Sequence, residues 1–242
     1  MIDEEANEYT EILDSHPTFY CGLPTVEATE QALKTPDEDS ALGLDMLPKR
    51  ILKQCAHVLA PVLHKLILAI LAVGEWPALW MVHWIVLLFK RKSVYQAGNY
   101  MGIHPTSQIS KFADRICARI FVQQLISTGA FGRNQFAYTP ERGGRDAIAQ
   151  LVLTWLVHFS RKKKIAVYCL DVSGAFDKVN SRRLVRKLRA KEVPEEILAV
   201  LQSWLAARTA RVAVGGKFSR DMRISDMVYQ GTVLGPPLWN IF

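Results

Sequence analysis

The chain has few cysteines, and nothing in their arrangement suggests a zinc site. Its four cysteines (Cys21, Cys55, Cys117 and Cys169) are scattered over 242 residues, with neither a Cys-x-x-Cys pair nor a Cys/His ligand spacing. Scattered cysteines of this kind are typical of reduced thiols inside the cell and argue against structural zinc. We therefore expect no disulfide partner.

A targeting segment and a long apolar run are also missing. The N-terminus, Met-Ile-Asp-Glu-Glu, has no basic stretch followed by an apolar one, so no secretory signal is predicted. The apolar region over residues 66–89 is interrupted by Gly74-Glu-Trp-Pro77 and by His83. Its runs are shorter than the roughly 20 residues that cross a bilayer. We expect a buried helix, a turn and a buried strand there, no membrane partner, and a nuclear or cytoplasmic location.

Charge is distributed very unevenly. Residues 1–45 hold twelve acidic residues and one lysine, a net charge of −11, whereas residues 46–242 hold 29 basic and 11 acidic residues, a net of +18. A body this basic suits a polyanionic partner such as a nucleic acid. The alternative is a solvated basic surface without a partner.

The spacing of apolar residues predicts mixed helices and strands. Helices are expected over residues 47–73, 107–127, 146–159, 181–191 and 194–205, and strands over residues 84–89 and 165–171, with a hairpin from 208–214 and 217–225. Pro61 is expected to kink or divide the first helix, Gly74 to end it, and Ser181 to cap a later one. The class is therefore α/β or α+β.

The most informative segment is Tyr168-Cys-Leu-Asp-Val-Ser-Gly-Ala-Phe-Asp177. It is interpreted as a buried strand that delivers the carboxylate of Asp171 to its carboxyl end. Nucleotidyl transfer uses two divalent cations about 4 Å apart, and Mg²⁺ prefers oxygen ligands such as carboxylates. Taken alone, an Asp at the end of a strand is more often a cap or turn residue than a metal ligand. A metal-binding role for Asp171 therefore depends on the surrounding motifs.

Six ordered segments resemble the reverse transcriptases of non-LTR retrotransposons. They are Ala32-Leu-Lys34 with Gly43-Leu-Asp-Met-Leu-Pro48; Gly74-Glu-Trp-Pro-Ala-Leu-Trp80 with residues 85–92 and Asn99-Tyr100; Asn134-Gln-Phe-Ala-Tyr138 with Pro140 and Arg142; residues 168–177; Arg208-Thr-Ala-Arg-Val-Ala-Val-Gly-Gly216; and Gln230-Gly-Thr-Val-Leu-Gly-Pro-Pro-Leu238. The resemblance implies a right-hand polymerase. An acidic, poorly ordered leader (1–22) would precede the fingers (about 23–160) and part of the palm (161–242), whose sheet would be incomplete.

The resemblance also implies roles for residues of the first palm motif. Asp171 would bind a metal through its carboxylate and Val172 through its backbone carbonyl. Phe176 would stack under the incoming sugar and exclude a 2′-hydroxyl. Asp177 is expected in a structural ion pair rather than as a ligand. The implied cofactor is Mg²⁺ or Mn²⁺.

Other implied roles concern substrates. Lys90, or Lys92, would reach the triphosphate, and Gln230 and Gly231 would line the pocket for nucleotide and template. The implied partners are an RNA template, a DNA primer and a deoxynucleoside triphosphate. Weaker nucleic-acid contacts, for which a solvated face is an equal alternative, are assigned to Arg142, Arg161, Lys162, Lys163, Arg182 and Arg183.

The chain departs from the family pattern at several positions. Met101 stands where the family has a triphosphate-gripping Arg, and a thioether cannot replace a charged, bidentate contact. The segment Pro36-Asp-Glu-Asp39 is acidic where relatives are basic, which weakens its attraction to a template backbone. Tyr229 replaces the usual Pro before Gln-Gly.

The family's Tyr/Phe-x-Asp-Asp motif does not occur in these 242 residues. Phe112-Ala-Asp-Arg115 lacks the second Asp and falls within a predicted helix, so it is rejected. Gly215-Gly-Lys217 is a hairpin turn rather than a phosphate loop. His57 and His64 have no apparent third ligand.

Three hypotheses follow. The first is a fingers and partial-palm fragment of a reverse transcriptase that is inactive, or nearly so, by itself. The second is a non-catalytic remnant that binds nucleic acid through its basic body. The third is a chain that does not fold stably, because a palm sheet without its central hairpin exposes strand edges and apolar surface.

Overall fold

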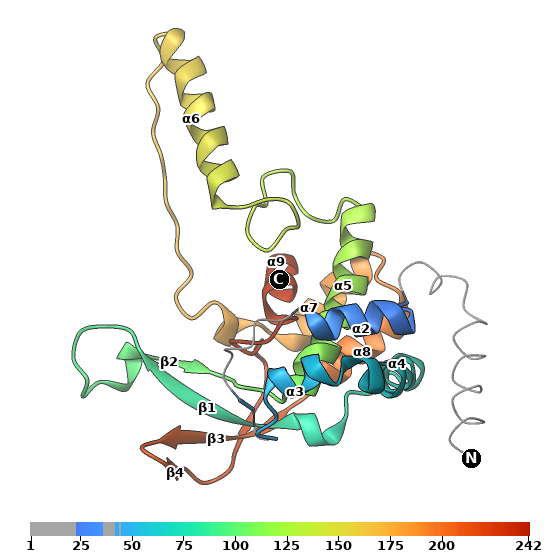
Figure 1. Ribbon diagram of the computed structural model, residues 1–242. Coiled ribbons are helices and arrows are strands. Elements are labelled where there is room, and N and C mark those ends of the chain that lie inside the picture. Colours follow the sequence, from blue (N-terminus) through green and yellow to red (C-terminus); the bar gives the residue numbers. More distant parts are fainter. Residues whose placement is uncertain (1–22, 36–41, 44) are drawn as a thin grey trace.

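The computed structural model describes residues 23–35, 42–43 and 45–242 (Figure 1). The leader expected over residues 1–22 and the acidic segment over residues 36–39 lie outside the described residues. The described helices are α2 (Val26–Lys34), α3 (Lys49–Gln54), α4 (Ala56–Val73), η2 (Ala78–Met81), η3 (Ala97–Asn99), α5 (Gln108–Ser127), α6 (Gly144–Ser160), η4 (Phe176–Lys178), α7 (Ser181–Ala190), α8 (Glu195–Trp204) and α9 (Gly235–Ile241).

A mixed sheet of five strands accompanies these helices. The strands are β1 (Val82–Phe89), β2 (Tyr100–Ile103), β3 (Arg208–Val214), β4 (Lys217–Phe218) and β5 (Met222–Ile224), in the order β2-β1-β3-β4 with β5 also on β3. β1 and β3 are parallel, with His83 opposite Ala210, and the other pairs are antiparallel. The predicted α/β class is confirmed, as is the hairpin at Gly215-Gly216.

The main core lies between the helices, on one side of the sheet (Figure 1). It contains fully buried residues from α4, α5 and α8, among them Ile67, Phe121, Leu198 and Trp204. α4 ends at Gly74, whose φ of 73° and N–H bond to the Ile70 carbonyl form a left-handed cap, as predicted. Burial of these apolar side chains is the main stabilising contribution to the fold.

The first long helix is interrupted, but not at the predicted residue. The break between α3 and α4 falls at Cys55, while Pro61 lies inside α4 without dividing it. Among the described residues, α4 alone is long and apolar enough to span a membrane by length and composition. Seven of its residues are buried, and α4 packs against α2 and α8 in the core.

The cap of α7 was also wrongly predicted. Ser181 is the first residue of the helix, and the side chain of Asn180 accepts the hydrogen bond from the Arg183 N–H at 3.0 Å. Asn and Ser are comparable caps, and the sequence offers both in succession. The helix therefore begins one residue earlier than a Ser181 cap requires.

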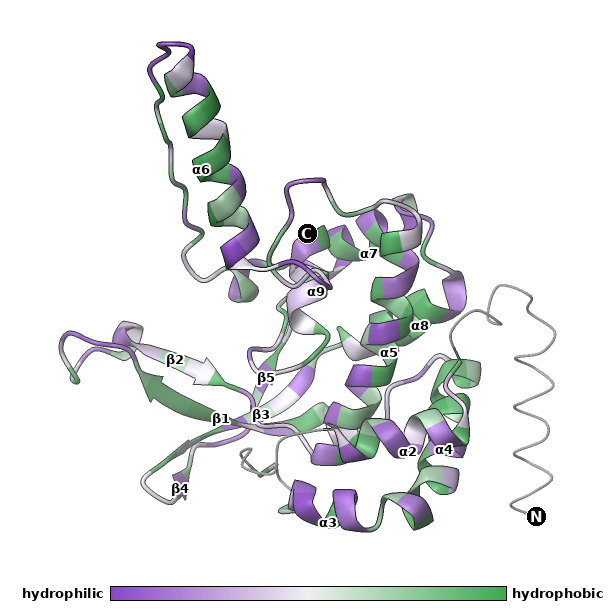
Figure 2. Ribbon diagram, turned by 45° about the horizontal axis from the view of Figure 1, so that its top comes forward, coloured by the Kyte–Doolittle hydropathy of each residue, from purple (hydrophilic) through white to green (hydrophobic). Residues whose placement is uncertain are grey.

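The predicted buried strand over residues 165–171 is wrong. This segment is an extended connection with no strand pairing, and Tyr168 and Leu170 are 85% and 80% exposed. It returns from the far end of α6, and the two project together from the rest of the molecule (Figure 1). The predicted helix α6 forms, yet none of its residues is buried, although it is rich in hydrophobic residues (Figure 2). Backbone groups form a strand only where a partner strand lies alongside, and the described residues provide none here.

Candidate nucleotide and nucleic-acid site

The turn at Gln230-Gly231 packs directly against the end of β2. The N–H of His104 donates to the carbonyl of Gln230 at 2.8 Å. Gly231 has a φ of 97°, and a Cβ there would lie 3.3 Å from Cγ2 of Ile103 and 3.5 Å from the carbonyl oxygen of His104. Both the backbone conformation and the close approach therefore require glycine. Gln230 and Gly231, two of the predicted site residues, are thus held against the end of β2, the strand that contains Met101.

Phe176 lies beside the same segment. Its carbonyl accepts the Val228 N–H at 3.1 Å, and its half-buried ring lies 6.2 Å from that of Trp239. A Cβ on Gly235 would approach Cε2 of Phe176 to 3.4 Å. The structure therefore brings Phe176 to residues 228–239.

Asp171 and Val172 lie at the end of the extended segment, and both are exposed. They precede a turn in which Gly174 has a φ of 63° and accepts the Asp177 N–H at 3.1 Å. No ion pair of Asp177 is found in the described part of the chain, so its predicted structural pair is not seen. Groups of three acidic, His or Cys side chains able to hold a metal are likewise missing from the described residues. The residues present do not fit a complete divalent metal site.

Lys90 and Lys92 lie at the far end of the β1–β2 pair. Lys90 bonds through its backbone N–H to the Asn99 carbonyl at 2.9 Å, and both lysine side chains are exposed. Gly231 packs near Ile103, which pairs with Val86, four residues before Lys90. At about 3.3 Å per strand residue, this separation is roughly 13 Å. The structure does not bring either lysine to the Gln230-Gly231 turn.

A buried polar cluster beneath this turn was not identified from the sequence. The ring nitrogens Nε2 of His83 and Nδ1 of His104 lie 2.8 Å apart, and the Tyr229 ring packs edge-on against both imidazoles. The Arg208 guanidinium lies 4.2 Å from the Tyr229 ring centroid and 4.8 Å from that of Trp204. His83, Arg208 and Tyr229 are almost wholly buried, at 0%, 1% and 0% exposed. This cation–π stack joins β3 to the residue before the Gln-Gly turn.

Hydrogen bonds extend the cluster to α5 and α8. Arg208 donates to the carbonyls of Trp204 at 2.9 Å and Trp80 at 3.3 Å. Trp204 in turn donates from Nε1 to the buried Asp114 carboxylate at 2.8 Å. The cluster therefore fixes β3 and the neighbouring end of the sheet to the helical core through buried hydrogen bonds.

Burial shifts the pKa of several of these groups. Burial, with the Arg208 charge acting in the same direction, lowers the pKa of His83 to about 3 and that of His104 to about 4. It raises the pKa of Asp114 to about 6, against the opposing effects of Arg208 and Trp204. Both imidazoles are therefore neutral at pH 7, which allows them to lie close to the Arg208 cation.

The weaker predicted nucleic-acid contacts occupy three separate places. Arg142 donates to the Arg133 carbonyl at 2.6 Å and lies 6.0 Å from the Phe136 ring centroid. Arg161, Lys162 and Lys163 follow α6 at the far end of the projecting arm, and Arg182 and Arg183 are exposed on α7. The structure does not gather them into one surface.

Comparison with known proteins places this fold among the nucleic-acid polymerases. The chain belongs to the reverse transcriptase (RNA-dependent DNA polymerase) family, which matches residues 99–242. It is 27% identical over 233 residues to the RNA-directed DNA polymerase from mobile element jockey of Drosophila melanogaster, covering 93% of this chain and 25% of that protein. The predicted family is confirmed.

Two further relatives are similar. The probable RNA-directed DNA polymerase from transposon BS of Drosophila melanogaster is 27% identical over 241 residues, 97% of this chain and 26% of the relative. That from transposon X-element of the same species is 27% identical over 178 residues, 72% of this chain and 19% of the relative. These are non-LTR elements. The chain spans about a quarter of the length of the jockey and BS proteins.

Proposed function

We propose that the chain provides the fingers (about 23–160) and the first part of the palm (161–242) of an RNA-directed DNA polymerase that copies RNA from a DNA primer. The observation that carries this proposal is the packing of Gln230-Gly231 against Ile103 and His104, with Phe176 alongside. This contact joins the segments expected to meet around a templating base and an incoming nucleotide. It depends on backbone geometry that only glycine satisfies at residue 231.

Within this function the predicted residues keep distinct roles. Phe176 supports the sugar of the deoxynucleotide, and Gln230 and Gly231 line the nucleotide and template pocket. Asp171 and the Val172 carbonyl are the oxygen ligands that this segment offers to Mg²⁺ or Mn²⁺, which would supply charge stabilisation when bound. Lys90 and Lys92 reach the triphosphate only if the β1–β2 end bends toward the turn. The proposed location is intracellular.

We further propose that a polypeptide of these 242 residues does not polymerise by itself. Asp171 is the one carboxylate that the predicted metal set draws from this sequence. Met101, opposite Leu88 in the β1–β2 pair, offers no cation to the triphosphate. Removing charge stabilisation at a phosphoryl-transfer site costs several orders of magnitude in rate.

Primer extension on an RNA template tests this proposal. The chain is incubated with a labelled DNA primer, deoxynucleotides and Mg²⁺, beside the Asp171→Ala variant and a longer reverse transcriptase as a positive control. We expect no extended product from either form of the chain. Mg²⁺-dependent synthesis by the natural sequence that Asp171→Ala abolishes would overturn the claim of inactivity while supporting the role of Asp171.

A non-catalytic nucleic-acid-binding role is the second candidate. α7 buries Leu184, Val185 and Leu188 and turns Arg182, Arg183 and Arg186 toward solvent. Such a helix can follow a phosphate backbone without chemistry. This role predicts RNA affinity that falls with salt and does not change in the Asp171→Ala variant. Affinity that is the same at low and high salt would contradict it.

A further inference from the structure

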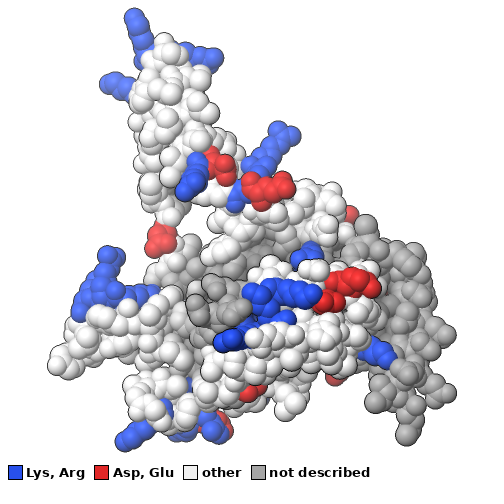
Figure 3. Space-filling view, in the orientation of Figure 1, with Lys and Arg blue, Asp and Glu red and all other residues white. Residues whose placement is uncertain are grey.

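Surface charge does not mark the Gln230-Gly231 turn as the place where a template base would lie. On the face shown in Figure 3, Lys and Arg side chains gather in separate groups, at the tip of the projecting arm, at the far end of the β1–β2 pair and over the region of α3 and α5. Charge spread over a surface attracts a polyanion but does not fix the position of one of its bases. The position of a base at the turn therefore depends on the packing around the turn itself.

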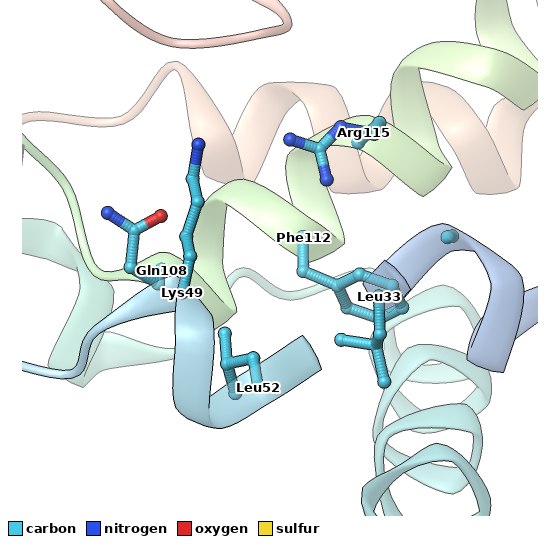
Figure 4. Close-up of a pocket in the computed structure, with 7 residues that line it drawn as sticks. Leu33, Lys49, Leu52, Gln108, Phe112 and Arg115 are labelled. Carbon is cyan, nitrogen blue, oxygen red and sulfur yellow. The ribbon is translucent and has the colours of Figure 1, made fainter. Parts of the chain in front are cut away.

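The hollow between α2, α3 and α5 offers no place for a base either (Figure 4). Its volume is about 10 Å³, which holds at most one water molecule. Leu33, Leu52 and Phe112, which line it, are 3%, 5% and 2% exposed, so the Phe112 ring has no free face on which a base could stack. This hollow therefore does not position a template base.

The Gln230-Gly231 turn leaves the protein interior through Tyr229. Val228 and Tyr229 are both 0% exposed, Gln230 is half-buried and Gly231 is exposed. Glycine has more backbone freedom than any other residue, so the exposed part of this turn needs a constraint from its neighbours. Tyr229 is the buried residue directly before the turn, and its side chain is placed to provide that constraint.

Four side chains enclose the Tyr229 ring. Its centroid lies 5.3 Å from that of His83 on β1 and 5.5 Å from that of His104, the residue after β2. The Trp204 ring lies 5.3 Å away on α8, and Cζ of Arg208 lies 4.2 Å away on β3. Edge-on ring pairs and cation–π contacts have preferred geometries, so together they hold the Tyr229 ring in one orientation.

The main chain links this ring to the turn. The Tyr229 carbonyl accepts hydrogen bonds from the Thr232 N–H at 3.2 Å and from the Thr232 hydroxyl at 2.6 Å, which close the turn. His104 contacts two successive residues, because its ring packs on Tyr229 and its N–H donates to the Gln230 carbonyl at 2.8 Å. The packed ring is therefore linked through three hydrogen bonds to both sides of the turn.

We propose that Tyr229 is a positioning residue for the template: its buried ring, held by His83, His104 and Arg208, fixes the Gln230-Gly231 turn in the orientation that receives the templating base. This inference rests on the proposed function, because the base it names belongs to the template of that reaction. Tyr229 itself touches neither the template nor the nucleotide and acts through the turn that follows it.

Hydrogen exchange of the full chain tests this role. Exchange is read at the His104 and Thr232 amides by fragment-ion mass spectrometry, first without nucleic acid and then with an RNA template annealed to a DNA primer. Tyr229→Leu removes the ring, whereas Tyr229→Phe keeps the ring and loses the hydroxyl that donates to the Ala206 carbonyl. Tyr229→Met also lacks a ring and covers the case in which Tyr229→Leu does not fold.

Phe121→Leu is the matched control, because it also removes a fully buried aromatic ring, on α5. It separates a general loss of stability from a loss of position at the turn. Fluorescence anisotropy of a labelled primer gives the overall affinity of each form for the primer–template.

Without nucleic acid, the His104 and Thr232 amides should exchange on the order of tenfold faster in Tyr229→Leu than in the natural chain, because their hydrogen bonds depend on the ring. In Tyr229→Phe and Phe121→Leu they should keep the natural rate. Added primer–template should slow exchange over residues 228–232 in the natural chain and in Tyr229→Phe, but not in Tyr229→Leu. The overall affinity should change by less than about twofold, since phosphate contacts dominate it.

Natural exchange rates at both amides in Tyr229→Leu, or in Tyr229→Met if the former does not fold, would overturn the inference and leave the proposed function standing. Slowing of residues 228–232 by the primer–template in that variant would do the same. Equal acceleration in Tyr229→Phe or in Phe121→Leu would also overturn the role of the ring. If the primer–template did not slow residues 228–232 in the natural chain, the proposed function would be contradicted, and the template role of Tyr229 with it.

Discussion

The main-chain N–H of His104 and the carbonyl oxygen of Gln230 form a 2.8 Å hydrogen bond that joins the end of β2 to the Gln-Gly turn. The side chain of His104 points into the protein interior, where its Nδ1 lies 2.8 Å from Nε2 of His83. Tyr229, directly before Gln230, packs on both imidazoles and on Arg208. The end of β2 and the Gln-Gly turn are therefore joined by both main-chain and side-chain contacts.

The first prediction concerns the pH dependence of stability. The pKa values of His83 and His104 are lowered on folding from the ordinary 6.5 to about 3 and about 4. Below pH 6.5 the unfolded chain binds protons that the folded chain does not, so stability falls as pH falls. The pKa of Asp114, raised to about 6, acts in the opposite direction below pH 6.

As the pH falls, His83 and His104 each destabilise the folded state, and Asp114 offsets one of them. The free energy of unfolding should therefore fall by about 1.4 kcal/mol for each pH unit between pH 6 and 4. Urea unfolding at pH 6, 5 and 4, followed by tryptophan fluorescence, measures this. A free energy of unfolding that stays constant or rises over that interval would show that the histidine pair is not held neutral.

The second prediction concerns Gly74. A Cβ at this residue would lie 2.8 Å from Cβ of Ala199, and its φ is 73°. Gly74→Ala is expected to lower the free energy of unfolding by about 2–3 kcal/mol, because it adds a steric clash between α4 and α8 to the backbone strain. The matched control is Gly216→Ala, with a φ of 75° but open space around the new Cβ. In Gly216→Ala, backbone strain alone should lower the free energy of unfolding by about 1 kcal/mol. Equal losses in the two variants would disprove the clash at residue 74.

The third prediction concerns Arg208. Arg208→Lys removes the planar group that donates to Trp80 and Trp204 and stacks on Tyr229. We expect a loss of about 2–4 kcal/mol, measured by urea unfolding, because a lysine cannot satisfy both carbonyls in this buried place. Arg211→Lys on the same strand, where the arginine is exposed and paired with Asp221, should cost less than about 1 kcal/mol. Comparable losses for the two substitutions would argue against a structural role specific to Arg208.

The fourth prediction concerns cysteine reactivity. Cys117 is buried on α5, and burial raises the pKa of its thiol to about 12, whereas Cys55 and Cys169 are exposed. Alkylation of the native protein at pH 8, read residue by residue by mass spectrometry, should modify Cys55 and Cys169 and leave Cys117 protected until urea is added. Rapid native alkylation of Cys117 would show that α5 is not packed as described.

Much of the helical framework could be predicted from the sequence. The periodic apolar residues over α5 predict a helix, and the glycine after α4 predicts where that helix ends. Both features depend on local geometry, and the structure confirms both. The strand over residues 165–171 could not be judged in this way. Its apolar residues predict burial, but a strand also needs a partner strand, which the described residues do not provide.

The site was predictable to a similar extent. Phe176, Gln230 and Gly231 stand in motifs, and the structure places Phe176 against Val228 and Gly235, on either side of the Gln230-Gly231 turn. The residues of the buried cluster, His83, His104, Arg208 and Tyr229, come from segments far apart in the chain. No local sequence pattern therefore predicts that they meet.

The central claim is that the Gln230-Gly231 junction is where template and nucleotide meet. A photo-crosslinking measurement tests it most directly, because it does not require catalysis. An RNA template annealed to a DNA primer carries 4-thiouridine as the first unpaired template base, and crosslinked peptides are identified by mass spectrometry. The account predicts crosslinks within residues 100–104, at Phe176 or within residues 228–232. Crosslinks confined to the projecting arm over residues 144–164, or to α7, would contradict it.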